Sequence, residues 1–144
     1  MAVDPKIQTG VAQTLMRLMH SLDRGDIAGF LDCWTEDGDL EVRFRDGRSH
    51  AAAGRDAIGA MTAPSMTRGP GKLRHVAGPV EVEEIGDGHV RTFSYCTYYW
   101  VGEEAGFAGM GEYRDELRLC PDGIWRVSRR RHAFLTDLNV TLGE

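Results

Sequence analysis

Residues 89–101 read HVRTFSYCTYYWV, and this stretch is the central element of the predicted fold. It is rich in aromatic and β-branched residues and holds neither glycine nor proline, so it predicts one long strand. Because side chains alternate across a strand, Tyr95 and Tyr99 fall on one face and Cys96 and Tyr98 on the other. Neither face is strongly polar, so we expect both to be covered. The strand then either lies between the core and a subunit contact, or lines a pocket with tyrosine hydroxyls as its polar points.

The length, charge and composition of the chain limit which partners and cofactors we expect. Its 144 residues suffice for one domain with its own core, and its net charge of −5 argues against binding to nucleic acid or to an anionic membrane. No apolar run is long enough to cross a bilayer, and residues 1–8 lack the apolar segment of a signal peptide, so we expect a cytoplasmic protein. The cysteines and histidines lack metal-ligand spacing, and the glycines form no dinucleotide fingerprint. We therefore predict no metal and no cofactor.

The segment before the long strand predicts three helices and a pair of strands. The first helix opens at Asp4-Pro5 and ends at Arg24-Gly25, and Asp26 caps a second one. The stretch Thr35-Glu36-Asp37-Gly38 is expected to end the second helix before a strand and a turn at Asp46-Gly47. A third helix starts at Gly54, and residues 62–72 are expected to form a loop at a pocket rim. The apolar stripe of the first helix comprises Ile7, Val11, Leu15, Leu18 and Leu22, with Ala12, Met16 and Met19 on one flank.

The rest of the chain predicts strands. One runs over residues 73–84 with an interruption at Gly78-Pro79, and two more follow the long strand at about residues 111–120 and 124–135. Helices therefore come first and a mostly antiparallel sheet follows, which indicates the α+β class.

Four short signatures follow one another along the chain: Leu22-Asp23-Arg24-Gly25-Asp26, Gly54-Arg55-Asp56-Ala57-Ile58, Arg74-His75 and Gly123-Ile124-Trp125-Arg126-Val127. Together they resemble the nuclear transport factor two-like superfamily, in its SnoaL-like branch. The resemblance covers the chain from about residue 7 to 135 and implies that residues 1–144 form a single domain. It implies a cystatin-like cone, in which three N-terminal helices pack in a strongly bent, mixed but mostly antiparallel sheet that encloses an apolar cavity.

The resemblance also implies a catalytic pair. In dehydratase-like members, an aspartate at the end of the first helix orients a histidine near the start of a strand, and Asp23 and His75 match those positions. Such a pair removes a proton beside an activating group without a metal. The alternative is a solvated Asp23 and a structural His75. The tyrosine or lysine that relatives often carry before the aspartate is missing at residues 18–20, so a hydroxyl of Tyr95, Tyr98 or Tyr99 would have to replace it. The base of ketosteroid isomerase would fall near Val42, which cannot act as one.

A second candidate cluster lies in the last two strands. Tyr113 and Asp115 share one face, so Asp115 is expected to be an inward carboxylate that needs a partner. By strict alternation Arg130 shares a face with His132, and it is our candidate for a catalytic arginine. The alternative is a structural ion pair with solvated arginines. The predicted substrate-binding residues are Met19, Trp34, Met61, Tyr95, Tyr99, Tyr113 and Asp115.

Two functions follow from the resemblance. The first is a cofactor-free lyase or isomerase that acts on a small apolar aromatic, polyketide or steroid-like molecule through Asp23 and His75. The second is a non-catalytic binding module or a beta subunit of a ring-hydroxylating dioxygenase, because residues 129–135, RRRHAFL, resemble the ending of such subunits. An imidazole that faces the cavity would favour the enzyme, and a plugged cavity the subunit. Both functions predict a homodimer, with a trimer as the alternative.

Overall fold

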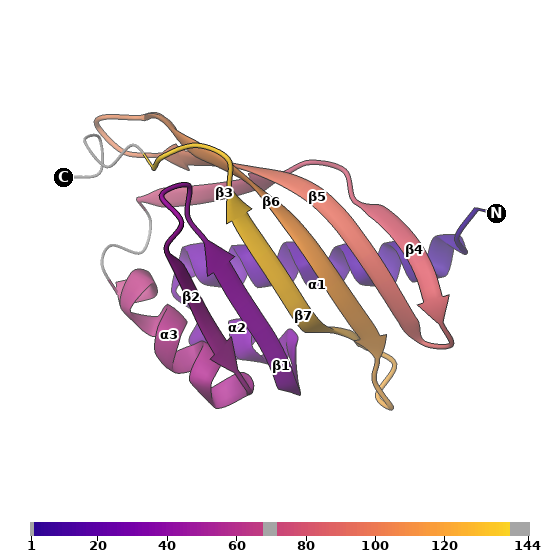
Figure 1. Ribbon diagram of the computed structural model, residues 1–144. Coiled ribbons are helices and arrows are strands. Elements are labelled where there is room, and N and C mark those ends of the chain that lie inside the picture. The colour runs from indigo at the N-terminus through magenta and orange to yellow at the C-terminus, as the bar shows by residue number, and fades with distance from the viewer. Residues whose placement is uncertain (1, 68–71, 139–144) are drawn as a thin grey trace.

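One curved sheet carries three helices on its concave side in the computed structural model, which describes residues 2–67 and 72–138 (Figure 1). The helices are α1 (Pro5–Arg24), α2 (Ile27–Asp32) and α3 (Arg55–Thr67). The strands are β1 (Trp34–Arg43), β2 (Ser49–Ala53), β3 (Leu73–Ala77), β4 (Glu81–Gly86), β5 (His89–Trp100), β6 (Gly106–Leu119) and β7 (Trp125–Phe134).

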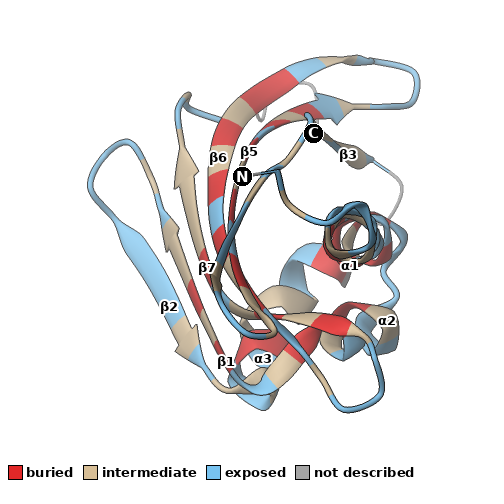
Figure 2. Ribbon diagram, turned by 90° about the vertical axis from the view of Figure 1, so that its right-hand side faces the viewer, coloured by how far each residue is buried: buried red, intermediate tan, exposed pale blue. Residues whose placement is uncertain are grey.

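The sheet has the order β2-β1-β7-β6-β5-β3, and β4 pairs with the beginning of β5. Only the β1–β7 ladder is parallel among these described pairs, and the other ladders are antiparallel. Viewed along α1, the sheet curls around this helix while α2 and α3 close one side (Figure 2). The predicted α+β class and the mixed, strongly bent cystatin-like sheet are confirmed.

Helix α1 is the axis of the cone. Asp4 caps it by accepting a hydrogen bond from the Lys6 N–H at 2.8 Å, and Gly25 ends it in a left-handed conformation with φ of 71°. Its apolar stripe is buried in the main core together with Phe30 and Trp34. Among the residues that the structure describes, no helix combines the length and the apolar character that a bilayer crossing requires.

Strand β5 is the long central strand that the sequence predicts. It pairs with β6 on one side and with β3 and β4 on the other. The concave face carries the residues of even number, including the buried Cys96 and Tyr98. Tyr95 and Tyr99 lie on the convex face and are 49% and 40% exposed, so the expectation that they line the pocket is wrong.

Three predicted boundaries are wrong, and one of them is the start of β6, which lies at Gly106 instead of near residue 111. Helix α2 ends at Asp32, and residues 35–38 lie inside β1, because Trp34 already pairs with Val127 of β7. Helix α3 continues to residue 67 through Pro64, and this extension buries Met66 in the core. The part of the expected loop at residues 68–71 lies outside the described residues.

A β-bulge changes which side chains of β7 point to the concave face of the sheet. Glu116 pairs with Arg129 but its neighbour Leu117 pairs with Val127, so one residue of β7 is left unpaired between them. Strict alternation had put Val127 and Arg130 on opposite faces, yet both are buried. The bulge therefore lets one strand send Val127 to the core and Arg130 into the cavity.

Candidate active site

Asp23 and His75 form a buried pair at the junction of α1 and β3. Asp23 Oδ1 lies 2.5 Å from His75 Nδ1, and Asp23 Oδ2 accepts a hydrogen bond from the His75 backbone N–H at 2.9 Å. The two side chains are only 6% and 11% exposed. This double contact fixes the position of β3 and the orientation of the imidazole ring. With Nδ1 held by the carboxylate, Nε2 is the ring nitrogen that a ligand can meet.

His75 borders two hollows on the concave side of the sheet. The larger one, the α1 lobe, measures about 610 Å³ and lies between the flank of α1 and residues 75–82. The smaller one, the α3 lobe, measures about 480 Å³ and lies among α2, α3, β1 and the end of β7. His75, Tyr113 and Arg130 line both hollows, and we call these three residues the waist. The imidazole therefore faces an open cavity rather than a filled core.

Arg130 is held at the waist by Asp115. Its Nε and one terminal nitrogen donate to the two carboxylate oxygens at 2.8 Å each, and its guanidinium lies 3.9 Å from the centre of the Tyr113 ring. Burial alone would lower the pKa of Arg130, but the charge and hydrogen bonds of Asp115 outweigh burial and hold the pKa above its usual value. The carboxylate takes two of the five guanidinium N–H groups, so the others remain to meet a ligand oxygen.

Tyr98 and His132 form a second polar pair beside the waist. The Tyr98 hydroxyl lies 2.5 Å from His132 Nε2, and the Tyr98 ring stands edge-on to that of His75 at 5.1 Å between centroids. Burial raises the pKa of Tyr98, so the hydroxyl stays protonated and donates to the histidine. Gly111 makes this approach possible, because a Cβ at that position would overlap the Tyr98 hydroxyl and lie 3.0 Å from His132 Nε2.

The predicted site residues divide into three groups. Met19 lines the α1 lobe, and Trp34 and Met61 line the α3 lobe. Tyr113 lies at the waist. Asp115 binds Arg130 there but lines neither lobe itself. The structure leaves Tyr95 and Tyr99 outside this group, on the other face of the sheet.

The sequence does not single out Tyr98 and His132. Tyr98 is one of the three tyrosines that could supply the missing hydroxyl, and the sequence assigns no role to His132. Alternation along β5 places Tyr98 on the same face as Cys96, but the burial of Cys96 in the structure is what shows that this face turns inward. Gly111, opposite Cys96 in the β5–β6 ladder, marks where the side chains crowd. Among the described residues, no group of three His, Cys, Asp or Glu side chains gathers as a metal site would require.

Because His132 is buried, we predict that the stability of the protein depends on pH. Burial, followed by the nearby charge of Arg130, lowers its pKa from 6.5 to about 3. The unfolded chain therefore takes up a proton here before the folded chain does, and stability falls as the pH drops from about 6.5 toward 3, by at most about 1.4 kcal/mol per pH unit. We expect chemical denaturation at pH 6.5 and 5.0 to show a smaller loss for His132→Phe than for the unchanged chain. Equal losses in the two proteins would contradict a buried neutral His132.

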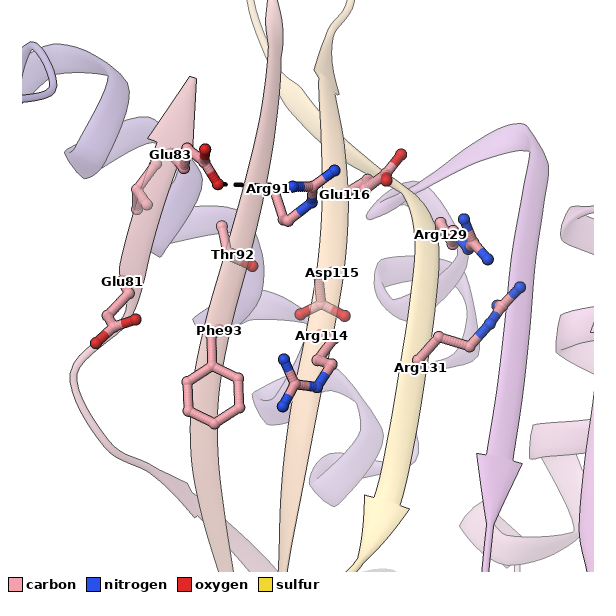
Figure 3. Close-up of a pocket in the computed structure, with 11 residues that line it drawn as sticks. Glu81, Glu83, Arg91, Thr92, Phe93, Arg114, Asp115, Glu116, Arg129 and Arg131 are labelled. Carbon is pink, nitrogen blue, oxygen red and sulfur yellow. Dashed lines mark ion pairs between the residues drawn. The ribbon is translucent and has the colours of Figure 1, made fainter. Parts of the chain in front are cut away.

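The convex face carries a separate, charged groove. Arginines and glutamates from β4 to β7 alternate along it, with Glu83 3.6 Å from Arg91 and the Arg114 guanidinium 4.8 Å from the centre of the Phe93 ring (Figure 3). The exposed Tyr95 lies against Phe93 at 5.1 Å between ring centroids. This groove lies across the sheet from His75, so it belongs to a surface other than the cavity.

The fold and the cavity define a class of protein: an α+β cone whose bent sheet encloses an apolar hollow with a histidine–aspartate pair at its wall. The model of the SnoaL-like domain matches residues 7–131, and the chain belongs to this family. The family is part of the nuclear transport factor two-like superfamily. A comparison with curated protein sequences finds no match.

Solved structures share the whole fold. Aln2 from a Streptomyces species is 26% identical with a TM-score of 0.79, over 93% of this chain and 94% of that one. A putative scytalone dehydratase from Novosphingobium aromaticivorans is 20% identical with a TM-score of 0.70, over 89% and 83%. The beta subunit of a putative aromatic-ring-hydroxylating dioxygenase from the same organism is 13% identical with a TM-score of 0.77, over 94% of each chain. Members of this fold thus differ in function, so the site has to decide the function here.

Proposed function

We propose that the protein is a cofactor-free lyase or isomerase that acts on a small apolar molecule of the aromatic, polyketide or steroid-like kind. The observation that carries the proposal is the buried Asp23–His75 pair, whose imidazole borders an open apolar cavity. A plugged cavity would have favoured a non-catalytic subunit. The contacts of Asp23 and the opening beside His75 favour the enzyme instead.

The geometry suggests the order of steps. Asp23 keeps the proton of His75 on Nδ1, so Nε2 accepts a proton from a substrate carbon next to a carbonyl group. The electron pair of the broken C–H bond moves into the carbonyl, and the free N–H groups of Arg130 stabilise the oxygen that becomes negative. In an isomerisation, the imidazolium returns the proton to another carbon. In a dehydration, it gives the proton to a departing hydroxyl on the β-carbon, which leaves as water.

Proton exchange tests this chemistry without knowledge of the natural substrate. The bicyclic ketone 2-tetralone has acidic C–H groups beside its carbonyl and fits a cavity of this size. In D₂O we expect the protein to speed up deuterium uptake at these carbons, as followed by NMR. His75→Ala should exchange at the buffer rate. His75 is rejected as a base if the unchanged protein does not speed up the uptake. It is also rejected if His75→Ala takes up deuterium as fast as the unchanged protein.

We also propose that the protein forms a homodimer through the convex face of the sheet, which includes the charged groove. Exposed aromatic side chains, Tyr99 and Phe107 among them, lie on the same face as alternating arginines and glutamates. A twofold axis can place a charge of such a surface next to an opposite charge in a second copy. Exposed apolar surface of this kind is more often an interface than free surface.

The mass in solution tests the dimer. At micromolar concentration we expect light scattering to give twice the mass of the chain, and Tyr99→Glu to give a monomer because it places a charge in the interface. Ala57→Glu, at an exposed position of α3, should leave the mass unchanged. A monomeric mass for the unchanged protein rejects the proposal, and a trimeric mass replaces it with the alternative assembly.

A further inference from the structure

His132 is held in one orientation at the wall of the α3 lobe. Its Nε2 lies 2.5 Å from the Tyr98 hydroxyl. Its ring also lies against two aromatic side chains, with the ring centroid of Tyr113 at 4.7 Å and that of Phe134 at 4.6 Å. A turn of the imidazole would break the hydrogen bond and disturb both ring contacts. The two ring nitrogens of His132 therefore keep fixed places.

The hydrogen bond between Tyr98 and His132 runs from the hydroxyl to the imidazole. Tyr98 is only 1% exposed, so its hydroxyl proton has to find an acceptor within the protein. Burial raises the pKa of Tyr98, and a hydrogen bond from the Tyr113 hydroxyl to the Tyr98 oxygen offsets part of this rise. Because Tyr113 donates to Tyr98, the proton of Tyr98 itself goes to His132 Nε2.

The other nitrogen of His132 then carries the proton of the ring. Burial, followed by the charge of Arg130, lowers the pKa of His132 to about 3, so the imidazole is neutral and holds a single proton, which lies on Nδ1. In the part of the chain that the structure describes, no acceptor bonds to Nδ1, and the buried side-chain nitrogens without a partner are Trp34 Nε1 and Arg55 Nε. The Nδ1–H group of His132 is therefore open to the α3 lobe that this residue lines.

His75 and His132 present opposite groups to the α3 lobe, although each carries its proton on Nδ1. Asp23 holds the Nδ1 proton of His75, so the ring of His75 offers a lone pair. The ring of His132 offers an N–H group instead, because Tyr98 occupies its Nε2. The wall of the lobe therefore contains both a base and a neutral hydrogen-bond donor.

Arg130 lies close to this neutral donor. Residues 130 and 132 follow the bulge of β7 and alternate with residue 131, so their side chains share a face. The Arg130 guanidinium lies 3.9 Å from the centre of the Tyr113 ring, against which the His132 ring also packs. A carbonyl oxygen has two lone pairs and can accept from one charged and one neutral donor at the same time.

We propose that His132 is a second donor to the substrate oxygen: its Nδ1–H and the free N–H groups of Arg130 together bind the carbonyl oxygen that becomes negative in the reaction. Tyr98 is then a positioning residue, because it acts through His132. The inference rests on the proposed function, since this oxygen belongs to the ketone from which His75 takes a proton. It also assigns a ligand preference, because a carbonyl accepts from both donors whereas an ammonium group has no lone pair for either.

Nuclear magnetic resonance of protein labelled with ¹⁵N-histidine reads the proton position directly. Long-range ¹H–¹⁵N correlations distinguish the two tautomers, and the loss of one set of signals in His132→Phe assigns that set to His132. At neutral pH we expect the Nδ1–H form of His132, and a mixture of both forms in Tyr98→Phe, where Nε2 has lost its donor. An Nε2–H form in the unchanged protein would overturn the proposal. A pure Nδ1–H form in Tyr98→Phe would contradict the positioning role of Tyr98.

The same spectra test the contact with a ligand oxygen. 2-Tetralone should move the Nδ1 proton of His132 to lower field, as a hydrogen bond to oxygen does. Tetralin, which has the same ring skeleton without the oxygen, should not. Equal shifts with the two compounds would overturn the proposal.

Deuterium uptake by 2-tetralone gives the catalytic test. Loss of one donor to an oxyanion lowers kcat by about 10²–10³-fold, and we expect a loss of this size for His132→Phe with a smaller change in KM. His132→Asn can place an amide N–H where Nδ1 stood, so it should recover part of the rate. Ala57→Phe adds the same ring at an exposed position of α3 and should leave the rate unchanged. Thermal unfolding and the affinity for tetralin, which needs no donor, show that the variants keep their fold and cavity.

The two proposals fail in different ways. If the unchanged protein does not speed up uptake, the proposed function falls, while a proton shift specific to the ketone still supports His132 as a donor to the ligand. If uptake depends on His75 but is as fast in His132→Phe as in the unchanged protein, the base stands and the second donor falls. His132→Asn that is no faster than His132→Phe also counts against the donor.

Discussion

His75→Ala is expected to remove turnover while the protein stays folded. The imidazole is the proton acceptor of the proposed reaction, and a general base contributes on the order of 10²–10⁴-fold to a rate. The fold should survive because Asp23 keeps one of its two partners in this variant: the backbone N–H of residue 75 still donates to Asp23 Oδ2. Rates of deuterium uptake, set beside thermal unfolding of the same samples, measure both effects.

Asp23→Asn provides the sharper variant of this experiment, because it keeps the shape of the side chain. An amide can donate its N–H to His75 Nδ1, which moves the ring proton to Nε2 and removes the lone pair that faces the cavity. In a serine protease triad the same change lowers kcat about 10⁴-fold. We expect a rate loss of that order with little loss of stability. An active Asp23→Asn protein would show that Asp23 does not set the tautomer.

Local patterns could predict most of the fold. The apolar stripe of α1, its cap at Asp4 and its stop at Gly25 depend on residues close in sequence, and so does the alternation of β5. The boundaries that failed depend on distant partners. Trp34 belongs to β1 because of its ladder with β7, and α3 continues past Pro64 because Met66 finds a place in the core.

The candidate site also has features that the sequence could predict and features that it could not. The pairing of Asp23 with His75 could be expected from the family resemblance, and the pairing of Asp115 with an arginine from burial of a charge. The sequence could not show which tyrosine of β5 lies beside the site. Alternation says which residues of β5 share a face but not which face turns inward. The facing of Arg130 relative to Val127 depends on a bulge, and a bulge leaves no clear mark in the residues that form it.

Asp115→Leu is expected to destabilise the protein strongly. The Asp115 side chain is fully buried and that of Arg130 is 9% exposed, and they meet through two hydrogen bonds of 2.8 Å. Removal of the carboxylate leaves a buried guanidinium without its counter-charge, which costs about 3–5 kcal/mol. Denaturant titration should show this loss. Glu83→Ala, which breaks an exposed ion pair with Arg91, should cost about 1 kcal/mol or less.

The double variant Asp115→Leu, Arg130→Met separates the cost of an unpaired charge from the worth of the pair. Replacement of a buried ion pair by apolar residues of similar volume is often neutral or even stabilising, so the double variant should regain most of the stability that Asp115→Leu loses. Its activity should not return, because the proposed stabiliser of the developing oxyanion is gone. A double variant as unstable as Asp115→Leu would mean that the pair is needed to shape the sheet. A fully active one would mean that Arg130 only balances the charge of Asp115, which is the structural role that competes with catalysis.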